Sequence, residues 1–477
     1  MLFTSMEFLF FFLPFVYGVN YLLNSRSRNY WLLFCSLFFY AWGEPSFVFL
    51  MIVSILFNYG VARIINDLDK KKKKKIFLII DIVFNLGLLF VFKYLNFVTK
   101  TVRTWFPATQ SFFPETSILL PIGISFFTFQ ALSYVIDVYR GVPAQKNPAY
   151  LGLYISLFPQ LIAGPIVRYS AIADQIEHRT VTFASFSDGV FQFLRGFNKK
   201  MLLANILAEV ADQAFSSNNN SICMAWLGAI CYSMQIFFDF SGYSDMAIGL
   251  GGMLGFKFEK NFNYPYISRT VTEFWRRWHI SLGSWFRDYV YFPLGGSRVK
   301  SQRKLIINLL VVWLLTGVWH GAEWTFIIWG LLYGAIIIFE KLMAIPNDMM
   351  INGSKVLKIL YRCFTCFVII IGWVLFRALN LQYASLYLSS MFGIAGNAFI
   401  DESFLFYIRE YKIFLIAGIV CSTPFFTWMK QKVRNSPSTI LVSGMEVISS
   451  GTQIFLFIIG VSCLIMKTHN PFIYFNF

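Results

Sequence analysis

The sequence predicts an all-α, polytopic membrane protein. Of its 477 residues, 57% are hydrophobic and only 13% are charged, which leaves too little polar surface to cover a soluble globule. Apolar segments of a length suited to membrane helices recur along nearly the whole chain, and no long polar linker divides them. We therefore expect one membrane domain over residues 1–477, with roughly eleven membrane-embedded helices.

Residues 1–100 are expected to hold the N-terminal spans. A WGEP turn signal joins two of the apolar segments, which are either two helices or one bent helix. The positive-inside charge bias favours two helices. Asp81 and Lys93 lie in the last segment, and we expect them near its ends, where they reach the lipid headgroups. The first segment lacks the basic start and the small-residue cleavage site of a signal peptide, so we expect a retained span. The segments are residues 6–24, 30–42, 46–60 and 76–98.

The central part of the chain has a different pattern, because glycines and prolines interrupt its apolar segments. Such interruptions are tolerated at membrane depth only where protein or a water-filled cavity satisfies the freed backbone groups. This predicts the interior of a site rather than a plain lipid-facing bundle. We assign residues 118–330 to a catalytic core, 331–468 to C-terminal spans and 470–477 to an aromatic C-terminal tail; the interrupting residues are Pro121, Gly123, Pro159, Gly164 and Pro165.

The net charge of +16 indicates a basic cytosolic face. In a soluble protein this charge would suggest nucleic acid as a partner, but the positive-inside bias and anionic lipid explain it more simply here. Residues 188–215, which carry Arg195, Lys199 and Lys200, are expected to lie along the cytoplasmic surface. The seven cysteines are scattered in apolar segments and predict no disulfide framework.

Two of the four histidines lie in apolar surroundings, and the first is His279. At 100° per residue, one face of a helix over this segment is aromatic and apolar, and the other is basic. We expect an amphipathic helix near the cytoplasmic interface, with His279 directed at the apolar interior. A core histidine satisfied by a backbone carbonyl is the alternative. The apolar face contains Trp275, Trp278, His279, Leu282, Phe286 and Tyr289, and the other side contains Arg276, Arg277, Ser284, Arg287 and Asp288.

His320 ends the apolar run LLVVWLLTGVWHG. A neutral imidazole at that depth can accept a proton, as the general base for a hydroxyl must. The sequence contains neither a GxSxG elbow nor an HExxH motif, and no third ligand accompanies the two histidines at metal-site spacing, so we expect no metal. Asp239 and Asp245 lie among aromatic and small residues, where an unpaired charge is costly, so we expect them to be paired.

Several long blocks of the sequence resemble the membrane-bound O-acyltransferase family. They are PIGISFFTFQALSYVIDVYRG, LFPQLIAGPIVRY, QIFFDFSGYSDMAIGLGGMLGF, NFNYPYISRTVTEFWRRWHISLGSWFRDYVYFPLGG and LLTGVWHG. The resemblance implies a ring of helices around a central funnel or tunnel. It places the catalytic histidine of the family at His320 and the second histidine of its bacterial branch at His279.

The resemblance also implies a reaction. The protein would take an acetyl group from acetyl-CoA, a cytosolic donor substrate rather than a bound cofactor, and pass it across the bacterial cytoplasmic (inner) membrane. The acceptor would be a hydroxyl of an envelope polysaccharide such as alginate or peptidoglycan, and an extracytoplasmic SGNH-type enzyme would be the partner. Membrane lipid competes with the donor for the basic groups. The expected donor or substrate residues are Arg276, Arg277, Arg287, Trp278, Trp319, Asp239 and Asp245.

The C-terminal tail PFIYFNF has two interpretations. Aromatic residues at a chain end commonly anchor it at the membrane interface. In the family branch, similar endings resemble an acyl-accepting tail, and Tyr474 would then carry the acyl group briefly. Two other functions also stay open: D-alanyl transfer from an acyl carrier protein to teichoic acid, and transport or flipping of an envelope precursor.

Overall fold

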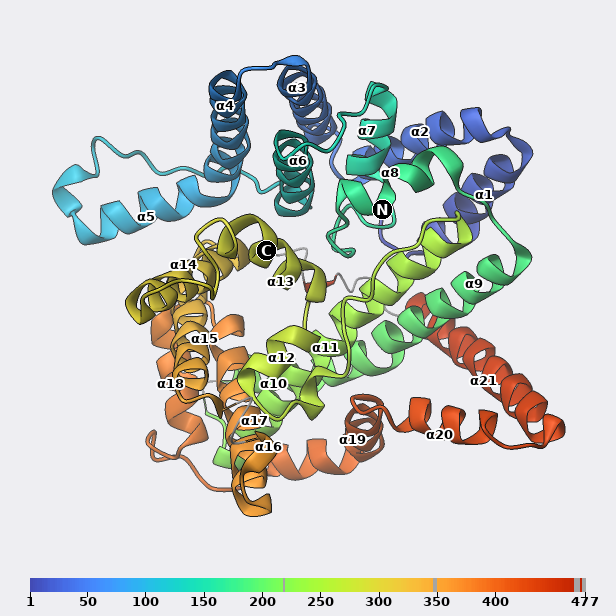
Figure 1. Cartoon of the computed structure of the whole chain (residues 1–477). Helices are drawn as coiled ribbons and strands as arrows, with labels where there is room; N and C mark the ends of the chain where they lie inside the picture. Colours follow the sequence, from blue (N-terminus) through green and yellow to red (C-terminus); the bar gives the residue numbers. More distant parts are fainter. Residues whose placement is uncertain (218, 346–349, 467–471, 474–477) are drawn as a thin grey trace. The chain divides into compact units, whose positions relative to one another are not determined.

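The computed structural model describes residues 1–217, 219–345, 350–466 and 472–473. Within these ranges the regular secondary structure is entirely helical, without a strand, so the all-α prediction is confirmed (Figure 1). In the central region, Gly123 directly precedes the helix that begins at Ile124, with a φ of 76°. Pro159, Gly164 and Pro165 lie in the non-helical segment 157–168, so these residues interrupt the helices as the sequence indicates.

In the described part of the chain, seven helical segments are long and apolar enough to cross a membrane, which confirms a multi-pass protein. The total of eleven embedded helices stays a prediction. Two further apolar helical segments, Phe8–Leu22 and Ile124–Tyr139, are shorter. The seven are α3 (Phe47–Asp67), the continuous segment Lys71–Trp105, α11 (Ile222–Met253), α14 (Gln302–His320), α15 (Trp324–Leu342), α17 (Lys355–Arg377) and α21 (Thr439–Met466).

Residue contacts divide the chain into two compact units, which are described separately. The first contains residues 1–193 and 246–259, and the second contains residues 194–245 and 260–473. The first unit is built from η1 (Phe8–Phe12), α1 (Leu13–Leu22), α2 (Ser25–Gly43), α3, α4 (Lys71–Leu89), η2 (Phe90–Tyr94), α5 (Leu95–Trp105), η3 (Pro107–Thr109), α6 (Ile124–Tyr139), α7 (Pro148–Ser156), α8 (Tyr169–His178) and the first part of α9 (Phe183–Asn198).

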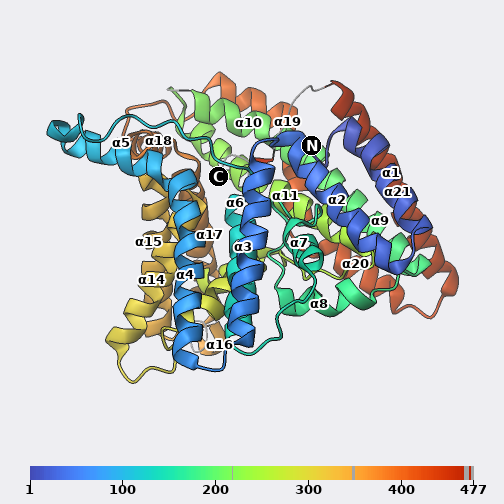
Figure 2. The same ribbon diagram turned by 90° about the horizontal axis from the view of Figure 1, so that it is seen from above.

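Helices α3, α4 and α6 of the first unit lie side by side (Figures 1 and 2). Their shared interior is polar in places: Asn85 of α4 donates a hydrogen bond to Asn58 of α3 (3.0 Å), and Lys93 donates one to Ser125 of α6 (3.1 Å). Asp81 is fully buried. The prediction that Asp81 and Lys93 reach the headgroups is therefore wrong, because the face of the segment that carries them packs on protein.

The second unit contains the histidine-bearing segments. Its remaining elements are η4 (Lys199–Ala204), α10 (Asn205–Ser216), η5 (Pro265–Ile267), α12 (Val271–Arg277), α13 (Ile280–Phe286), η6 (Arg287–Tyr291), α14, α15, α16 (Met350–Asn352), α17, α18 (Leu381–Met391), α19 (Glu402–Cys421), α20 (Phe425–Arg434) and α21, together with most of α11.

Two segments of this unit differ from the sequence predictions. Within the expected C-terminal spans of residues 331–468, the apolar run at 383–399 is expected to be one span, but it forms only α18, which Gly393 ends with a positive φ of 70°. Residues 188–215 do not simply follow the surface, because the side chain of Lys200 is 2% exposed and pairs with Asp239 of α11. A charged side chain is buried at this position because an opposite charge lies beside it.

Candidate functional site

The segment around His279 is not one amphipathic helix, so that prediction is wrong. Helix α12 ends at Arg277, and α13 begins at Ile280. His279 lies between them with a φ of 45°, in the left-handed region that residues other than glycine adopt uncommonly. The break changes the direction of the chain at His279, yet the imidazole is buried as predicted, with 2% exposure.

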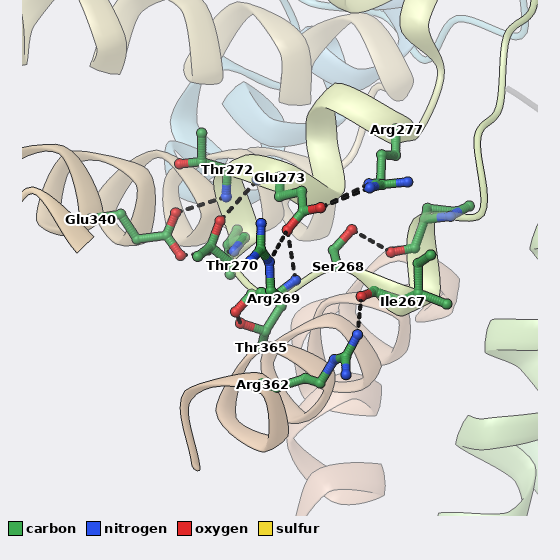
Figure 3. A network of polar contacts seen from close by, with 12 residues as sticks. Ile267, Ser268, Arg269, Thr270, Thr272, Glu273, Arg277, Glu340, Arg362 and Thr365 are labelled. Atoms are coloured by element: carbon green, nitrogen blue, oxygen red, sulfur yellow. Dashed lines mark hydrogen bonds and ion pairs between the residues drawn. The ribbon is translucent and has the colours of Figure 1, made fainter. Parts of the chain in front are cut away.

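Helix α12 is held at its N-terminus by a carboxylate from α15. Glu340 is fully buried and accepts hydrogen bonds from the backbone N–H groups of Val271 and Thr272, both at 2.7 Å (Figure 3). The hydroxyl of Thr270 accepts a third from the N–H of Glu273 at 3.0 Å. These bonds satisfy three of the backbone N–H groups that have no partner within the helix. The negative charge of Glu340 is also favourable here, because the N-terminal end of the helix dipole is positive. These contacts fix the position of α12 and therefore of the residues at its C-terminal end.

Asn261 explains the break at His279. Its backbone carbonyl accepts from the N–H of Ile280 (2.9 Å), and its side-chain Oδ1 accepts from the N–H of Ser281 (3.2 Å). These groups would otherwise bond within a continuous helix. Asn261 therefore serves as an external cap for the start of α13, and it lies on the loop before η5.

The same amide fixes the protonation of His279. Oδ1 of Asn261 lies 3.1 Å from Nδ1 of His279. Because the backbone N–H of Ser281 can only donate, the Asn261 atom that it contacts must be the oxygen. Nδ1 of the neutral imidazole therefore carries the hydrogen and donates it to Asn261. Nε2 is left as the acceptor, and it is buried without a hydrogen-bond partner among the described residues.

Burial also sets the charge of His279. Removal from water lowers the pKa of its imidazole from 6.5 to about 3, because the cation loses its hydration without gaining a carboxylate partner. His279 is thus neutral near pH 7. A neutral imidazole with an acceptor Nε2 can receive a hydrogen bond or a proton from a hydroxyl.

His320 is placed by the crossing of α14 and α15. The two helices meet at glycines: a Cβ on Gly317 would lie 2.5 Å from the carbonyl oxygen of Phe326, and a Cβ on Gly330 would lie 2.5 Å from that of Trp313. The backbones can approach closely only because both positions lack side chains. His320 is the last residue of α14 and is 2% exposed.

The two histidines come together around one tryptophan. The ring centroid of Trp319 lies 5.9 Å from that of His279 and 4.9 Å from that of His320. His320 also packs edge-on against Trp329 and Phe376, at 4.9 and 5.2 Å. Trp278, with 1% exposure, belongs to the neighbouring aromatic cluster and contacts Trp373 at 4.7 Å.

The three arginines predicted to bind the donor differ in their contacts. Arg277 is paired with Glu273 (2.9 Å) in the network of Figure 3, and Arg287 is paired with Asp288 (2.9 Å). Arg276 is exposed at the end of α12 and forms no ion pair within the described residues. Local carboxylates thus neutralise two of the three cations.

Both aspartates of α11 are in ion pairs. Asp239 pairs with Lys200, and both side chains are 2% exposed; Asp245 pairs with Lys199 at 2.6 Å and is less buried. Phe240, next to Asp239, packs edge-on against His279 at a centroid distance of 4.7 Å. Tyr474, the expected acyl carrier, lies outside the described residues.

Sequence reasoning missed Asn261 and Glu340, which orient the segment that carries His279. A polar residue in the aromatic run NFNYPY and a lone acidic residue in the apolar run of α15 are the signals that point to them. Neither signal names a partner, because the partners are 18 and 69 residues away in the chain.

The structure is thus a helical protein with several membrane-length segments and two buried histidines that contact the same tryptophan. The chain belongs to the MBOAT family, the membrane-bound O-acyltransferases, whose profile matches residues 34–345. It is therefore a multi-pass membrane acyltransferase. It is 38% identical to a probable alginate O-acetylase, AlgI, of Pseudomonas putida, over 100% of both chains.

Two further relatives define the breadth of the similarity. A peptidoglycan O-acetyltransferase of Helicobacter pylori is 34% identical over 100% of this chain and 98% of its own length. A teichoic acid D-alanyltransferase of Bacillus subtilis is 31% identical, but over only 49% of this chain and 62% of its own length.

Proposed function

We propose that this acyltransferase takes an acetyl group from acetyl-CoA in the cytosol and passes it across the bacterial cytoplasmic membrane to an envelope polysaccharide. The observation that carries the proposal is full-length similarity to two proteins named for the O-acetylation of alginate and of peptidoglycan. An extracytoplasmic SGNH-type enzyme is the proposed partner for the final transfer. Residues 1–477 would act as one membrane domain.

His320 is the proposed general base. It would accept the proton of the attacking hydroxyl while the hydroxyl oxygen forms a bond to the thioester carbonyl carbon. The carbon–sulfur bond then breaks, and the departing thiolate takes the proton from the imidazolium to leave as the free thiol. The donor thus loses its acetyl group as an ester, and His320 returns to its neutral form.

His279 is proposed to orient the donor, because the single proton of the attacking hydroxyl goes to His320. Its Nε2 can accept a hydrogen bond from an N–H or O–H group of the donor, whereas it cannot donate to a carbonyl oxygen in this tautomer. The contacts of Asn261 therefore support an orienting role for His279, and they do not support stabilisation of charge as the thioester opens. Trp278 and Trp319 would exclude water from the reacting groups. Exclusion of water strengthens the polar contacts in the site.

Arg276 is the proposed first contact for the phosphates of the donor, because Arg277 and Arg287 are already paired with carboxylates. Lipid phosphates compete for the same cation. Asp239 and Asp245 are proposed to act through their lysine partners rather than by contacting the donor.

Tyr474 is proposed to carry the acetyl group briefly, between its release from acetyl-CoA and its transfer to the acceptor. Its phenol would attack the thioester to form a phenyl ester, and a polysaccharide hydroxyl or the partner enzyme would then take the acetyl group and restore the phenol. A phenol is a good leaving group, so the ester keeps much of the transfer potential of the thioester.

Radiolabelled acetyl-CoA mixed with the purified protein tests the proposal. We expect label on the protein, and we expect Tyr474→Phe to lose it while His178→Ala, on an exposed side chain, keeps it. Labelling that requires a D-alanyl-charged carrier protein would instead support D-alanyl transfer to teichoic acid. The partial coverage of the D-alanyltransferase relative disfavours that second function.

A further inference from the structure

The end of the described chain contacts a buried ion pair of the second unit. The backbone N–H of Ile473 donates a 2.8 Å hydrogen bond to Oδ2 of Asp239, whose other oxygen pairs with Lys200. Phe472, which precedes it, is 1% exposed. Residues 472–473, called the C-terminal segment below, therefore bind the Asp239 carboxylate through a main-chain N–H group.

The aromatic ring of the segment completes the contact. Nζ of Lys200 lies 4.6 Å from the ring centroid of Phe472, within the range of a cation–π interaction. The same ring packs edge-on against Tyr243 at 4.8 Å. The C-terminal segment thus contacts both members of the ion pair and a tyrosine one helical turn after Asp239.

A buried ion pair needs such partners. Removing two charges from water costs several kcal/mol per ion, and their attraction offsets this only when further hydrogen bonds satisfy the remaining lone pairs. Ile473 supplies a donor to the second carboxylate oxygen, and Phe472 supplies a ring face to the ammonium. The segment and the ion pair therefore stabilise each other.

Helix α11 connects this contact with His279. Asp239 and Tyr243 face the C-terminal segment, while Phe240 and Ser244, the residues that follow each of them, face the histidine side. Phe240 packs on His279, and Ser244 Oγ accepts a 3.1 Å hydrogen bond from the side-chain amide of Asn261. Adjacent faces of the same stretch of α11 carry the two groups of contacts.

Helix α21, which precedes the segment in the sequence, packs beside η4. Phe457 of α21 packs on Phe197 at 4.9 Å, and Asn198 donates a 3.1 Å hydrogen bond to the carbonyl of Gln453. Both partners directly precede η4, which carries Lys200. These contacts hold α21, the last helix before the segment, against the part of the chain that carries Lys200.

We propose that Lys200, Asp239 and Tyr243 form a docking site for the chain's own C-terminal segment, and that α11 couples occupancy of this site to the orientation of His279. The coupling rests on the proposed function, whereas the docking does not. The docked residues directly precede Tyr474, the proposed acyl carrier, in the sequence.

Hydrogen exchange of the intact protein in detergent or nanodiscs tests the docking. We expect the amide of Ile473 to exchange at least about tenfold faster in Phe472→Ala, and also in the double variant Lys200→Met/Asp239→Leu, because each removes part of the site. The double variant removes both charges together, which buried ion pairs commonly tolerate. Lys200→Arg should keep the protection, since it retains the charge and the ring contact.

Asp212→Asn provides the matched control, because it removes a carboxylate that pairs with Arg377 elsewhere in the same unit. Exchange at Ile473 that is equal in the double variant and in this control would overturn the docking site.

Acetyl transfer by the same proteins tests the coupling. We expect Phe472→Ala to lower kcat about tenfold, leave KM for acetyl-CoA unchanged and shift the pH dependence of kcat, whereas Asp212→Asn does none of these. An unchanged kcat with a faster-exchanging Ile473 would overturn the coupling and leave the docking in place. Absence of transfer by every protein, with the exchange pattern as expected, would refute the proposed function and not the docking site.

Discussion

His279 and His320 are equally buried, but different interactions hold them. His279 lies in a break between two short helices and is held by polar groups, chiefly the amide of Asn261. His320 ends a long helix, and its position depends on two glycines and on the aromatic rings around it. Hydrogen bonds can fix which nitrogen carries a proton, whereas close packing fixes only where the ring lies. The contacts of His279 with Asn261 therefore set which of its nitrogens is protonated, and the glycines and rings around His320 set where that ring lies.

The largest effect is expected at His320. His320→Ala should lower the rate of acetyl transfer by about 10²–10⁴-fold, the usual contribution of a general base. Transfer of label from acetyl-CoA measures it, with circular dichroism and gel filtration confirming that the variant is folded. His178→Ala, on an exposed side chain, should be unaffected. A variant without His320 that still transfers at the normal rate would remove this residue from the mechanism.

Asn261 tests the polar half of the comparison. Asn261→Ala leaves Nδ1 of His279 and the N–H of Ser281 without their acceptor, which should cost about 1–3 kcal/mol of stability. Because His279 is then no longer held in one tautomer, kcat should also fall. Asn261→Asp keeps an acceptor and adds a negative charge, which raises the pKa of His279. The acid limb of the kcat–pH profile should therefore move to higher pH in the aspartate variant. A limb that stays in place would limit Asn261 to a structural role.

Gly330 tests the packing half. In Gly330→Ala the new Cβ would lie 2.5 Å from the carbonyl oxygen of Trp313, so the α14–α15 crossing must widen. We expect a loss of about 1–3 kcal/mol in stability and a lower Tm, with transfer reduced through the displaced His320. Gly60→Ala is the control, because nothing lies within 4 Å of a Cβ there. Equal Tm values for the two variants would contradict the close approach.

The smallest effect is a pH dependence of stability. The folded pKa of His279, about 3, is below its ordinary value of 6.5, so between these values the unfolded chain binds a proton that the folded protein does not. Stability should therefore be complete above pH 6.5 and fall as the pH drops toward 3, with a slope of at most about 1.4 kcal/mol per pH unit. Thermal unfolding at several pH values measures this slope. It should shrink in His279→Gln and persist in His178→Gln.

Much of the fold could be read from the sequence. Hydropathy identified the long spans, since a membrane helix must be apolar over about 20 residues whatever surrounds it. It failed at α18, where an apolar segment is cut short at Gly393, and at Asp81 and Lys93, whose surroundings are other helices rather than headgroups. Hydropathy indicates that a segment is removed from water. It does not show whether lipid or other parts of the protein surround that segment.

The site was predicted in part. Both histidines and Trp319 could be named from their apolar runs, and the resemblance to the acyltransferase family assigned expected roles to the histidines. The helix through His279 was predicted as continuous because Trp275, Leu282 and Phe286 follow a helical period on both sides of the break. Periodicity continues through a single left-handed residue, so the pattern alone could not reveal it.

The sequence by itself determined that this protein is helical, embedded in a membrane and a member of an acyltransferase family, because these properties depend on local composition and on motifs contiguous in the chain. The tertiary structure alone decided which nitrogen of His279 carries the hydrogen, how closely α14 and α15 approach and where residues 472–473 bind. Each of these depends on partners distant in sequence: Asn261 for the imidazole, facing glycines for the crossing, and Asp239 for the C-terminal segment. A hydrogen bond or a close contact depends on distances in space, which the order of residues along the chain does not state.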